Sequence, residues 1–307
     1  MSMAVIVPTR NRPVDLPVAV STVLAQTVLP SEMIIVDQSP QDDSKRAIAE
    51  LFATAGDRVR QQVALKYIHN PAISGLTTAR NEALRHSCSD VVLFLDDDVE
   101  LESDFIEKLL AAYAEYPEVA GVSGIVTNYV PEGLLNRLWR KIFVTGPFHD
   151  DRQAIYHEAD RLRHSPPLPV TRLGGGLMSF RSSAIRDVPF DANLKGASEG
   201  EDVDFCMHLG PAMKLMIHPG ARLVHKGSPA GRVSEHWIGA LVRGNTYLYY
   251  RNWNSGLTNK ARFIWLKAGY SLLALAASVR RGDLAPWRTF QRALRQGRQL
   301  GRGEPPC

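Results

Sequence analysis

The chain has 307 residues, of which 45% are hydrophobic and 22% are charged. This composition is typical of a soluble globular protein and excludes a disordered or fibrous chain, and the length allows one large α/β domain with a smaller appendage. The formal net charge is only +4, and we expect no nucleic-acid partner. Three widely separated cysteines, Cys88, Cys206 and Cys307, argue against a disulfide framework or a thiolate metal site and favour a reducing cytoplasm.

The first half of the chain alternates short β-rich runs with helical stretches. Strands are predicted at 4–7, 33–36, 65–68 and 91–95, and helices at 16–24, 44–52, 76–85 and 105–113. The first run carries no basic-then-apolar leader, so we expect no cleaved signal sequence. Such alternation predicts a mostly parallel sheet covered by helices on both faces, with ligands at the carboxyl ends of its strands. The polar residues that follow these strands are Thr9, Arg10, Asn11, Arg12, Asp37, Ser39, Asn70, Asp96, Asp97 and Asp98.

The second half of the chain is less regular. Between Gly133 and Pro169 the pattern weakens and predicts an irregular excursion, after which regular structure resumes near Arg172. From Ser234 onward the periodicity is helical. Arginines crowd the end of this tail, at Arg280, Arg281, Arg288, Arg292, Arg295, Arg298 and Arg302. They fit either a solvated helix face or contact with an anionic surface such as membrane lipid.

The strongest local signal is the apolar run 91–95, which leads directly into Asp96, Asp97 and Asp98. In an extended chain Asp96 and Asp98 face the same side, where both can bind one hard cation. Mg²⁺ or Mn²⁺ held in this way keeps positions for water and phosphate oxygens, which indicates a diphosphate site. The alternative is that these carboxylates cap the next helix, although repulsion among three adjacent like charges disfavours it.

Three later features add candidates for the same site. A second acidic cluster at 199–204 opens a predicted helix that runs to Leu209, and the helix dipole favours ionised carboxylates in its first turn, as a general base requires. The glycines at 174–176 would let the backbone approach a ligand closely, although a flexible loop explains such a run as well. His225 ends the apolar run 221–224 and is either a metal ligand or a surface residue.

Together these segments resemble the family 2 glycosyltransferases of the GT-A fold, from Ala4 to about Lys226. The matching pieces are Val5-Ile-Val-Pro-Thr-Arg-Asn, Ile35-Val-Asp-Gln-Ser, Gly75-Leu-Thr-Thr-Ala-Arg-Asn, Phe94-Leu-Asp-Asp-Asp, Gly175-Gly-Leu and Gly200-Glu-Asp. The resemblance implies an α/β GT-A catalytic domain at 1–230, with a nucleotide-binding half at about 1–126 and an acceptor half at about 127–230. A basic helical region at 231–307 would follow and would bind a membrane or another subunit.

The resemblance also implies roles for individual residues. Asp98 would be the most direct ligand of Mg²⁺ or Mn²⁺, with Asp96 and His225 as further ligands. Asp202 would be the catalytic base, and Glu201 would orient the acceptor or the donor sugar. Asp97 would contact the ribose or the donor sugar. The full set implied for binding the nucleotide sugar is Pro8, Thr9, Arg12, Asp37, Arg80, Asp96, Asp97, Gly175 and Gly176.

The implied activity is metal-dependent transfer of a sugar from a UDP-, GDP- or dTDP-sugar to a hydroxyl of a glycan or lipid-linked glycan, with inversion by direct displacement. Rhamnosyl, galactosyl and glucosyl transfer all stay open. Two departures from the family pattern limit the likeness. The second loop has Asp37-Gln-Ser in place of the commoner Asp-Asp-Gly-Ser, and no Gln-x-x-Arg-Trp sequence follows the base, which argues against a processive synthase of the cellulose type.

Other functions compete for the same residues. A haloacid dehalogenase-type phosphatase would use Asp96 as nucleophile, but that family carries its motif after the first strand, whereas three strand–helix units precede Asp96 here. A nucleotidyltransferase would need a Gly-rich loop after the first strand, and the loop that begins at Pro8 has no glycine. A catalytically inactive sugar-binding or scaffold protein is opposed by the intact acidic motifs.

The apolar run 263–279 contains one charge, Lys267, and is shorter than the roughly 20 residues that span a bilayer. Arginines bracket it, and tryptophans occur nearby, as in helices that lie at a membrane interface. We therefore expect a cytoplasmic protein that attaches peripherally to the inner membrane face. The alternative is a helix packed on the catalytic domain or on another subunit of a homo-oligomer.

Overall fold

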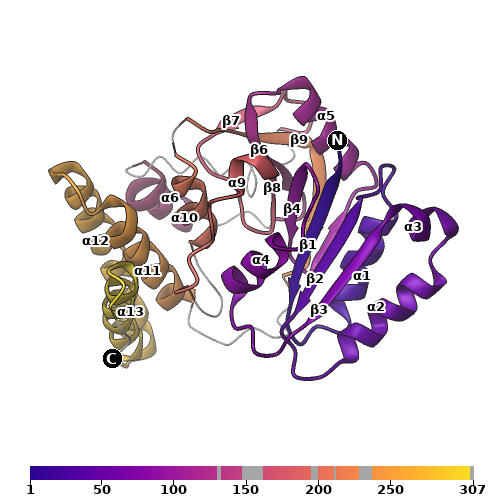
Figure 1. Ribbon diagram of the computed structural model, residues 1–307. Coiled ribbons are helices and arrows are strands. Elements are labelled where there is room, and N and C mark those ends of the chain that lie inside the picture. The colour runs from indigo at the N-terminus through magenta and orange to yellow at the C-terminus, as the bar shows by residue number, and fades with distance from the viewer. Residues whose placement is uncertain (130–132, 147–161, 195–199, 211, 228–236, 305–307) are drawn as a thin grey trace.

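A nine-stranded sheet forms the centre of the structure, a computed structural model that describes residues 1–129, 133–146, 162–194, 200–210, 212–227 and 237–304. Its strand order is β3-β2-β1-β4-β8-β6-β9-β5, with β7 beside β9 (Figure 1). The strands are β1 (Met3–Thr9), β2 (Glu32–Asp37), β3 (Ala64–His69), β4 (Val91–Leu95), β5 (Val99–Leu101), β6 (Val119–Val126), β7 (Leu168–Val170), β8 (Leu177–Arg181) and β9 (Lys214–His225).

Helices cover both faces of this sheet and form a separate group at the C-terminal end (Figure 1). Those of the first part are α1 (Asp15–Leu24), α2 (Asp43–Thr54), α3 (Asp57–Gln62), α4 (Leu76–Leu84) and α5 (Phe105–Glu115). The later ones are α6 (Leu134–Arg140), the π-helix η1 (Lys141–Thr145), α9 (Ser182–Ile185), α10 (Glu201–His208), α11 (Trp237–Leu248), the π-helix η2 (Tyr249–Trp253), α12 (Leu257–Arg281) and α13 (Ala285–Gly301).

The predicted parallel sheet is confirmed for the four predicted strands. β1 pairs in parallel with β2 and β4, and β2 pairs in parallel with β3. Beyond β4 the sheet is mixed, because β8 runs antiparallel to β4 and β6, and β5 and β7 run antiparallel to β9. The parallel arrangement therefore holds among β1, β2, β3 and β4, whereas the sheet as a whole is mixed. The direction of β8 depends on where the chain re-enters the sheet after a long excursion, which no local pattern records.

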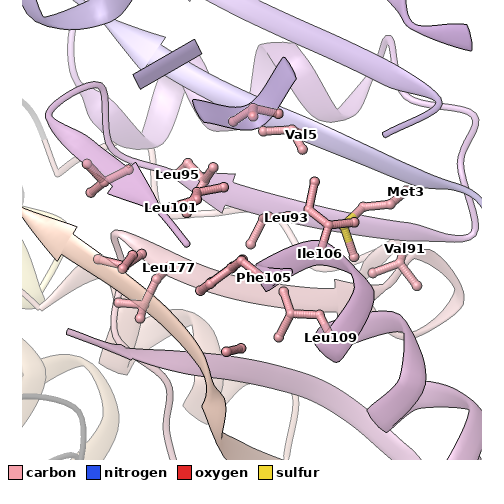
Figure 2. Close-up of a cluster of buried hydrophobic side chains, with 14 of the residues drawn as sticks. Met3, Val5, Val91, Leu93, Leu95, Leu101, Phe105, Ile106, Leu109 and Leu177 are labelled. Atoms are coloured by element: carbon pink, nitrogen blue, oxygen red, sulfur yellow. The ribbon is translucent and has the colours of Figure 1, made fainter. Parts of the chain in front are cut away.

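Both faces of the parallel half are apolar, so alternate residues of each strand enter different cores. On one face Val5 and Leu93 pack under α5, where Phe105, Ile106 and Leu109 point toward the strands (Figure 2). On the other face a second cluster joins the sheet to α4 and α10. This double burial explains why the strands appear in the sequence as continuous apolar runs.

The region between Gly133 and Pro169, predicted to be irregular, contains helix in its described part. α6 and η1 occupy residues 134–145, and β7 begins at Leu168. The indole N–H of Trp139 donates to the carbonyl oxygen of Gly269 at 3.2 Å, so this helix packs against α12. Its partner lies more than a hundred residues away in sequence, which explains why the local pattern did not reveal it. Residues 147–161 lie outside the described part.

The C-terminal region is helical, as predicted. α11, α12 and α13 share a core that includes Val242, Leu266, Tyr270 and Phe290. No helix among the described residues is both long enough and apolar enough to cross a membrane.

Close packing of the sheet predicts that an added side chain at Gly124 destabilises the fold. A Cβ there would lie 2.4 Å from the carbonyl oxygen of Ala221 and 2.5 Å from the Phe105 ring. Gly124→Ala should therefore lower the free energy of unfolding by about 1–3 kcal/mol, measured by urea denaturation. Gly56→Ala, where a Cβ meets nothing within 4 Å, is the control and should cost less than about 1 kcal/mol. Equal stabilities for the two variants would contradict this packing.

Candidate active site

Asp96, Asp98 and His225 come together at the carboxyl end of β4. The Nε2 atom of His225 lies 3.0 Å from Oδ1 of Asp98 and 4.0 Å from Oδ2 of Asp96. The two aspartates follow β4 in a turn, whereas His225 ends β9 and pairs with Val99 of β5. One ligand atom from each of the three residues falls within 4.8 Å of the others. Two carboxylates and an imidazole suit Mg²⁺ or Mn²⁺, so the residues present fit the cation that the sequence predicts.

Asp97 is not part of this group of three and instead links two loops by hydrogen bonds. Its Oδ1 accepts a hydrogen bond from Arg12 at 2.6 Å, and its Oδ2 accepts one from the Thr9 hydroxyl at 2.6 Å. Burial raises the pKa of Asp97 to about 7, although Arg12 and Thr9 oppose the shift. Arg12 also lies 3.0 Å from Asp98. Thr9, Arg12 and Asp97 therefore fix the loop after β1 to the turn that carries the candidate metal ligands.

Asp37 and Pro8 lie inside the fold at the ends of β2 and β1. Asp37 is completely buried, and its carboxylate accepts hydrogen bonds from the Ser39 backbone N–H at 2.8 Å and from the Tyr67 hydroxyl at 2.6 Å. Pro8 is also buried. In this arrangement Asp37 orders the loop after β2, and its predicted contact with the nucleotide stays a prediction.

Arg80 of α4 is a fully buried cation next to the acidic groups. Its guanidinium donates to Oε1 of Glu201 at 3.1 Å and to the carbonyl oxygen of Gly175 at 2.7 Å, and it lies 3.8 Å from Oδ1 of Asp96. The sequence predicted Arg80 as a contact of the nucleotide sugar. The structure places it where it joins α4, the glycine loop, α10 and the turn after β4.

Glu201 and Asp202 begin α10. Asp202 accepts hydrogen bonds from the backbone N–H groups of Gly175 at 3.2 Å and Val203 at 2.8 Å. Burial, together with the charge of Asp202, raises the pKa of Glu201 to about 8, and Arg80 opposes the shift. Burial and Asp202 thus favour the protonated form of Glu201, whereas the ion pair with Arg80 favours the carboxylate. Glu199, the first residue of the predicted acidic cluster at 199–204, lies outside the described residues.

The glycine loop permits close approach, as predicted, but the groups that approach are side chains of the protein. A Cβ on Gly176 would lie 2.4 Å from Oδ2 of Asp96, and one on Gly175 would lie 2.7 Å from Oε1 of Glu201. These two positions therefore leave room for both carboxylates.

A pocket of about 330 Å³ connects these groups. It is lined by Leu76, Arg80, Asp96, Gly175, Gly176, Gly200, Glu201, Asp202, Val203, Leu241, Gly244, Asn245 and Leu248. The candidate base and one candidate metal ligand thus share a single pocket.

One wall of this pocket comes from α11, which sequence reasoning did not connect with the site. Leu241, Gly244, Asn245 and Leu248 belong to the region expected to serve attachment. α11 and η2 are anchored to the sheet domain by the Tyr247 hydroxyl, which donates to Asp191 at 2.8 Å, and by Asn252, which donates to Asp204 at 2.7 Å. No local motif in the sequence marks this wall, because it depends on contacts between distant segments.

A model of the family described as "Glycosyl transferase family 2" matches residues 4–187. The chain belongs to this family. The phosphatase interpretation is not supported, because the acidic motif of this family 2 glycosyltransferase follows the fourth strand along the chain and the matched family is a glycosyltransferase family.

Curated relatives match part of the chain. The chain is 32% identical over 163 residues to "Pre-mycofactocin glycosyltransferase" of Mycobacterium tuberculosis, which covers 52% of this chain and 32% of the relative. It is also 32% identical over 120 residues to "GalNAc(5)-diNAcBac-PP-undecaprenol beta-1,3-glucosyltransferase" of Campylobacter jejuni, which covers 39% of this chain and 37% of that protein. The family 2 chain thus spans about a third of the length of each.

Solved structures share its fold. S. aureus TarS 1–349 in complex with UDP-GlcNAc superposes with a TM-score of 0.61 at 16% identity, over 98% of this chain and 81% of that one. The mannosyltransferase PcManGT from Pyrobaculum calidifontis, in complex with GDP-Man and Mn²⁺, superposes with a TM-score of 0.58 at 17% identity, over 97% and 86% of the two chains. The predicted GT-A fold is confirmed.

The raised pKa of Glu201 predicts a pH-dependent stability. Its folded-state pKa lies above its ordinary value of 4.5, so the stabilisation is complete below pH 4.5 and is lost as the pH rises through about 8. Glu201→Gln, which keeps a neutral side chain, should therefore lose less stability than the wild type between pH 5 and pH 9, measured by urea denaturation at each pH. Glu118→Gln, whose side chain is half exposed, is the control and should follow the wild type. Parallel profiles for wild type and Glu201→Gln would contradict the burial argument.

Proposed function

We propose that this family 2 glycosyltransferase transfers a sugar from a nucleoside-diphosphate sugar to an acceptor hydroxyl. The observation that carries the proposal is the position of Asp96, which belongs both to the group of three candidate metal ligands and to the pocket that contains Asp202. A donor diphosphate on the metal and an acceptor hydroxyl beside the base would then meet in one cavity.

Asp96, Asp98 and His225 are the residues that would hold Mg²⁺ or Mn²⁺. Such an ion, when bound, neutralises charge on a departing diphosphate. The PcManGT complex contains GDP-Man and Mn²⁺, and GalNAc-T7 has been solved with UDP, GalNAc and Mn²⁺, which supports a divalent cation here. UDP-, GDP- and dTDP-sugars all remain candidate donors.

The donor would lie along the carboxyl ends of β1, β2 and β4, in the half of the domain before residue 126. There Thr9, Arg12 and Asp97 order the first loop, Pro8 and Asp37 fix the ends of their strands, and Gly175, Gly176 and Arg80 shape the floor beside Asp96. Most of these side chains would act by positioning loops, because their polar atoms already bond to one another.

Asp202 is the proposed general base. As the acceptor oxygen attacks the anomeric carbon, its proton passes to the Asp202 carboxylate, and the bond between that carbon and the diphosphate oxygen breaks. This single displacement inverts the configuration at the anomeric carbon. Glu201 would hold a sugar hydroxyl in place by hydrogen bonding.

The acceptor would enter from the side of α11, and we propose a glycan or lipid-linked glycan. The name of the Campylobacter relative, with its PP-undecaprenol group, supports a lipid-linked acceptor. A cytoplasmic enzyme held at the inner membrane face would meet such an acceptor at the bilayer surface.

Separate roles for metal ligands and base predict different losses on substitution. Asp98→Asn should weaken Mn²⁺-dependent donor binding by roughly tenfold or more, measured by calorimetry. Asp202→Asn should leave that affinity nearly unchanged but slow release of nucleoside diphosphate from the donor by about 10²–10⁴-fold. Asp57→Asn, with a side chain 81% exposed, is the control and should match the wild type in both assays. Near-normal turnover of Asp202→Asn would refute the assignment of the base.

A further inference from the structure

α12 has two apolar faces. Phe263, Leu266, Tyr270 and Ala274 are buried, and the last three join the core shared with α11 and α13. A second set is exposed, with exposed fractions from 44% for Leu275 to 85% for Leu257. This set is Leu257, Ile264, Leu272, Leu275 and Val279. At 100° per residue these positions fall within one sector of the helix, so they form a continuous stripe along its length.

α6 and η1 extend this exposed apolar area. Leu134, Leu135, Leu138 and Ile142 have exposed fractions between 43% and 81%. This segment lies against α12 at the edge of the helical group (Figure 1), where the Trp265 indole N–H donates to the carbonyl oxygen of Ile142 at 2.9 Å. We call the two exposed sets together the α6–α12 surface.

The two exposed sets lie on the same side of the helix pair. The Trp139 and Tyr270 rings are tilted, with their centroids 5.2 Å apart, whereas Phe143, one turn later, stacks on Trp265 at 5.0 Å. The helices are therefore antiparallel. On each helix the exposed stripe is rotated by roughly a quarter-turn from the line of contact with the other helix, in the same direction when viewed from that helix's N-terminus. Because the two helices are antiparallel, both stripes lie on the same side of the pair.

The charges of α6, η1 and the C-terminal helices are almost all positive. The sequence from Trp237 to Gly301 contains eleven lysines and arginines and one acidic residue, Asp283. α6 and η1 add Arg137, Arg140 and Lys141 without any acid. Because the whole chain is only +4, the remaining residues carry a net negative charge. The positive charge is therefore concentrated in α6, η1 and the C-terminal helices, which include the helices that carry the exposed apolar stripe.

We propose that the α6–α12 surface binds an anionic lipid bilayer, with α12 lying in the plane of the interface. Leucine and isoleucine side chains would enter the acyl boundary, while the lysines and arginines would contact anionic headgroups. A symmetric pair of copies joined through this face is disfavoured, since the equally positive helices of the second copy would repel it. The inference deepens the proposed attachment at the membrane and names the residues that would make it.

The test uses the full chain and vesicles of phosphatidylcholine with or without 25% phosphatidylglycerol, in a cosedimentation assay at low salt. The wild type should bind the anionic vesicles and bind neutral vesicles far less. Leu272→Ser/Leu275→Ser/Val279→Ser should lower the partition coefficient by roughly tenfold or more. The control is Val14→Ser/Met213→Ser, which removes exposed apolar side chains elsewhere and should bind as the wild type does.

No binding by the wild type, or equal binding by the triple variant, would overturn the proposal. Dimerisation in sedimentation velocity that the triple variant loses, without vesicle binding by the wild type, would also overturn it and assign the face to a second copy. Thermal stabilisation by nucleoside diphosphates with Mn²⁺ is measured in parallel on every variant. If the wild type does not bind vesicles but is stabilised by nucleotide, the proposed transfer activity stands and the membrane surface does not. If the wild type binds vesicles but does not respond to any nucleotide, only the membrane surface stands.

Discussion

The site depends on one buried cation. Arg80 is completely removed from solvent, and an unpaired charge in that position would cost several kcal/mol. Its partners come from three other segments: Glu201 from α10, the carbonyl oxygen of Gly175 from the loop before β8, and Asp96 from the turn after β4. The Phe94 and Phe190 rings lie 5.7 and 5.3 Å from the guanidinium carbon. Because these partners must converge on Arg80, it fixes the relative positions of the candidate base and the candidate metal ligand.

The electrostatic balance around Arg80 favours the binding of a divalent cation. Asp96 shares a candidate metal site with Asp98 and a pocket with Glu201 and Asp202, and the cations that pair with these carboxylates include Arg80 and Arg12. The pKa of Glu201 is raised because burial and a neighbouring carboxylate disfavour its charge. A divalent ion on Asp96, Asp98 and His225 would relieve the remaining repulsion. The surplus of carboxylates would thus give the pocket affinity for a metal and its diphosphate.

Local patterns were sufficient to predict the first four strands along the chain and the side chains that follow them. The run 91–95 is β4, and Asp98 and His225 meet although 127 residues separate them. The rest depends on contacts that no short pattern records. α6 is stabilised by α12, the direction of β8 follows from the path of the chain, and Asn245 reaches the pocket only because α11 docks on α10. The glycine at 176 was predicted to make room for a ligand, and in the structure it makes room for Asp96.

The central claim is that these carboxylates and His225 bind a nucleoside diphosphate through a divalent ion. The most direct measurement is the melting temperature of the protein with UDP, GDP or dTDP in Mn²⁺, in Mg²⁺ and in EDTA, because a ligand that binds only the folded state must raise it. The account predicts stabilisation by one nucleotide class that requires the metal and disappears in EDTA. Equal melting temperatures in all of these conditions, or stabilisation that persists in EDTA, would contradict it.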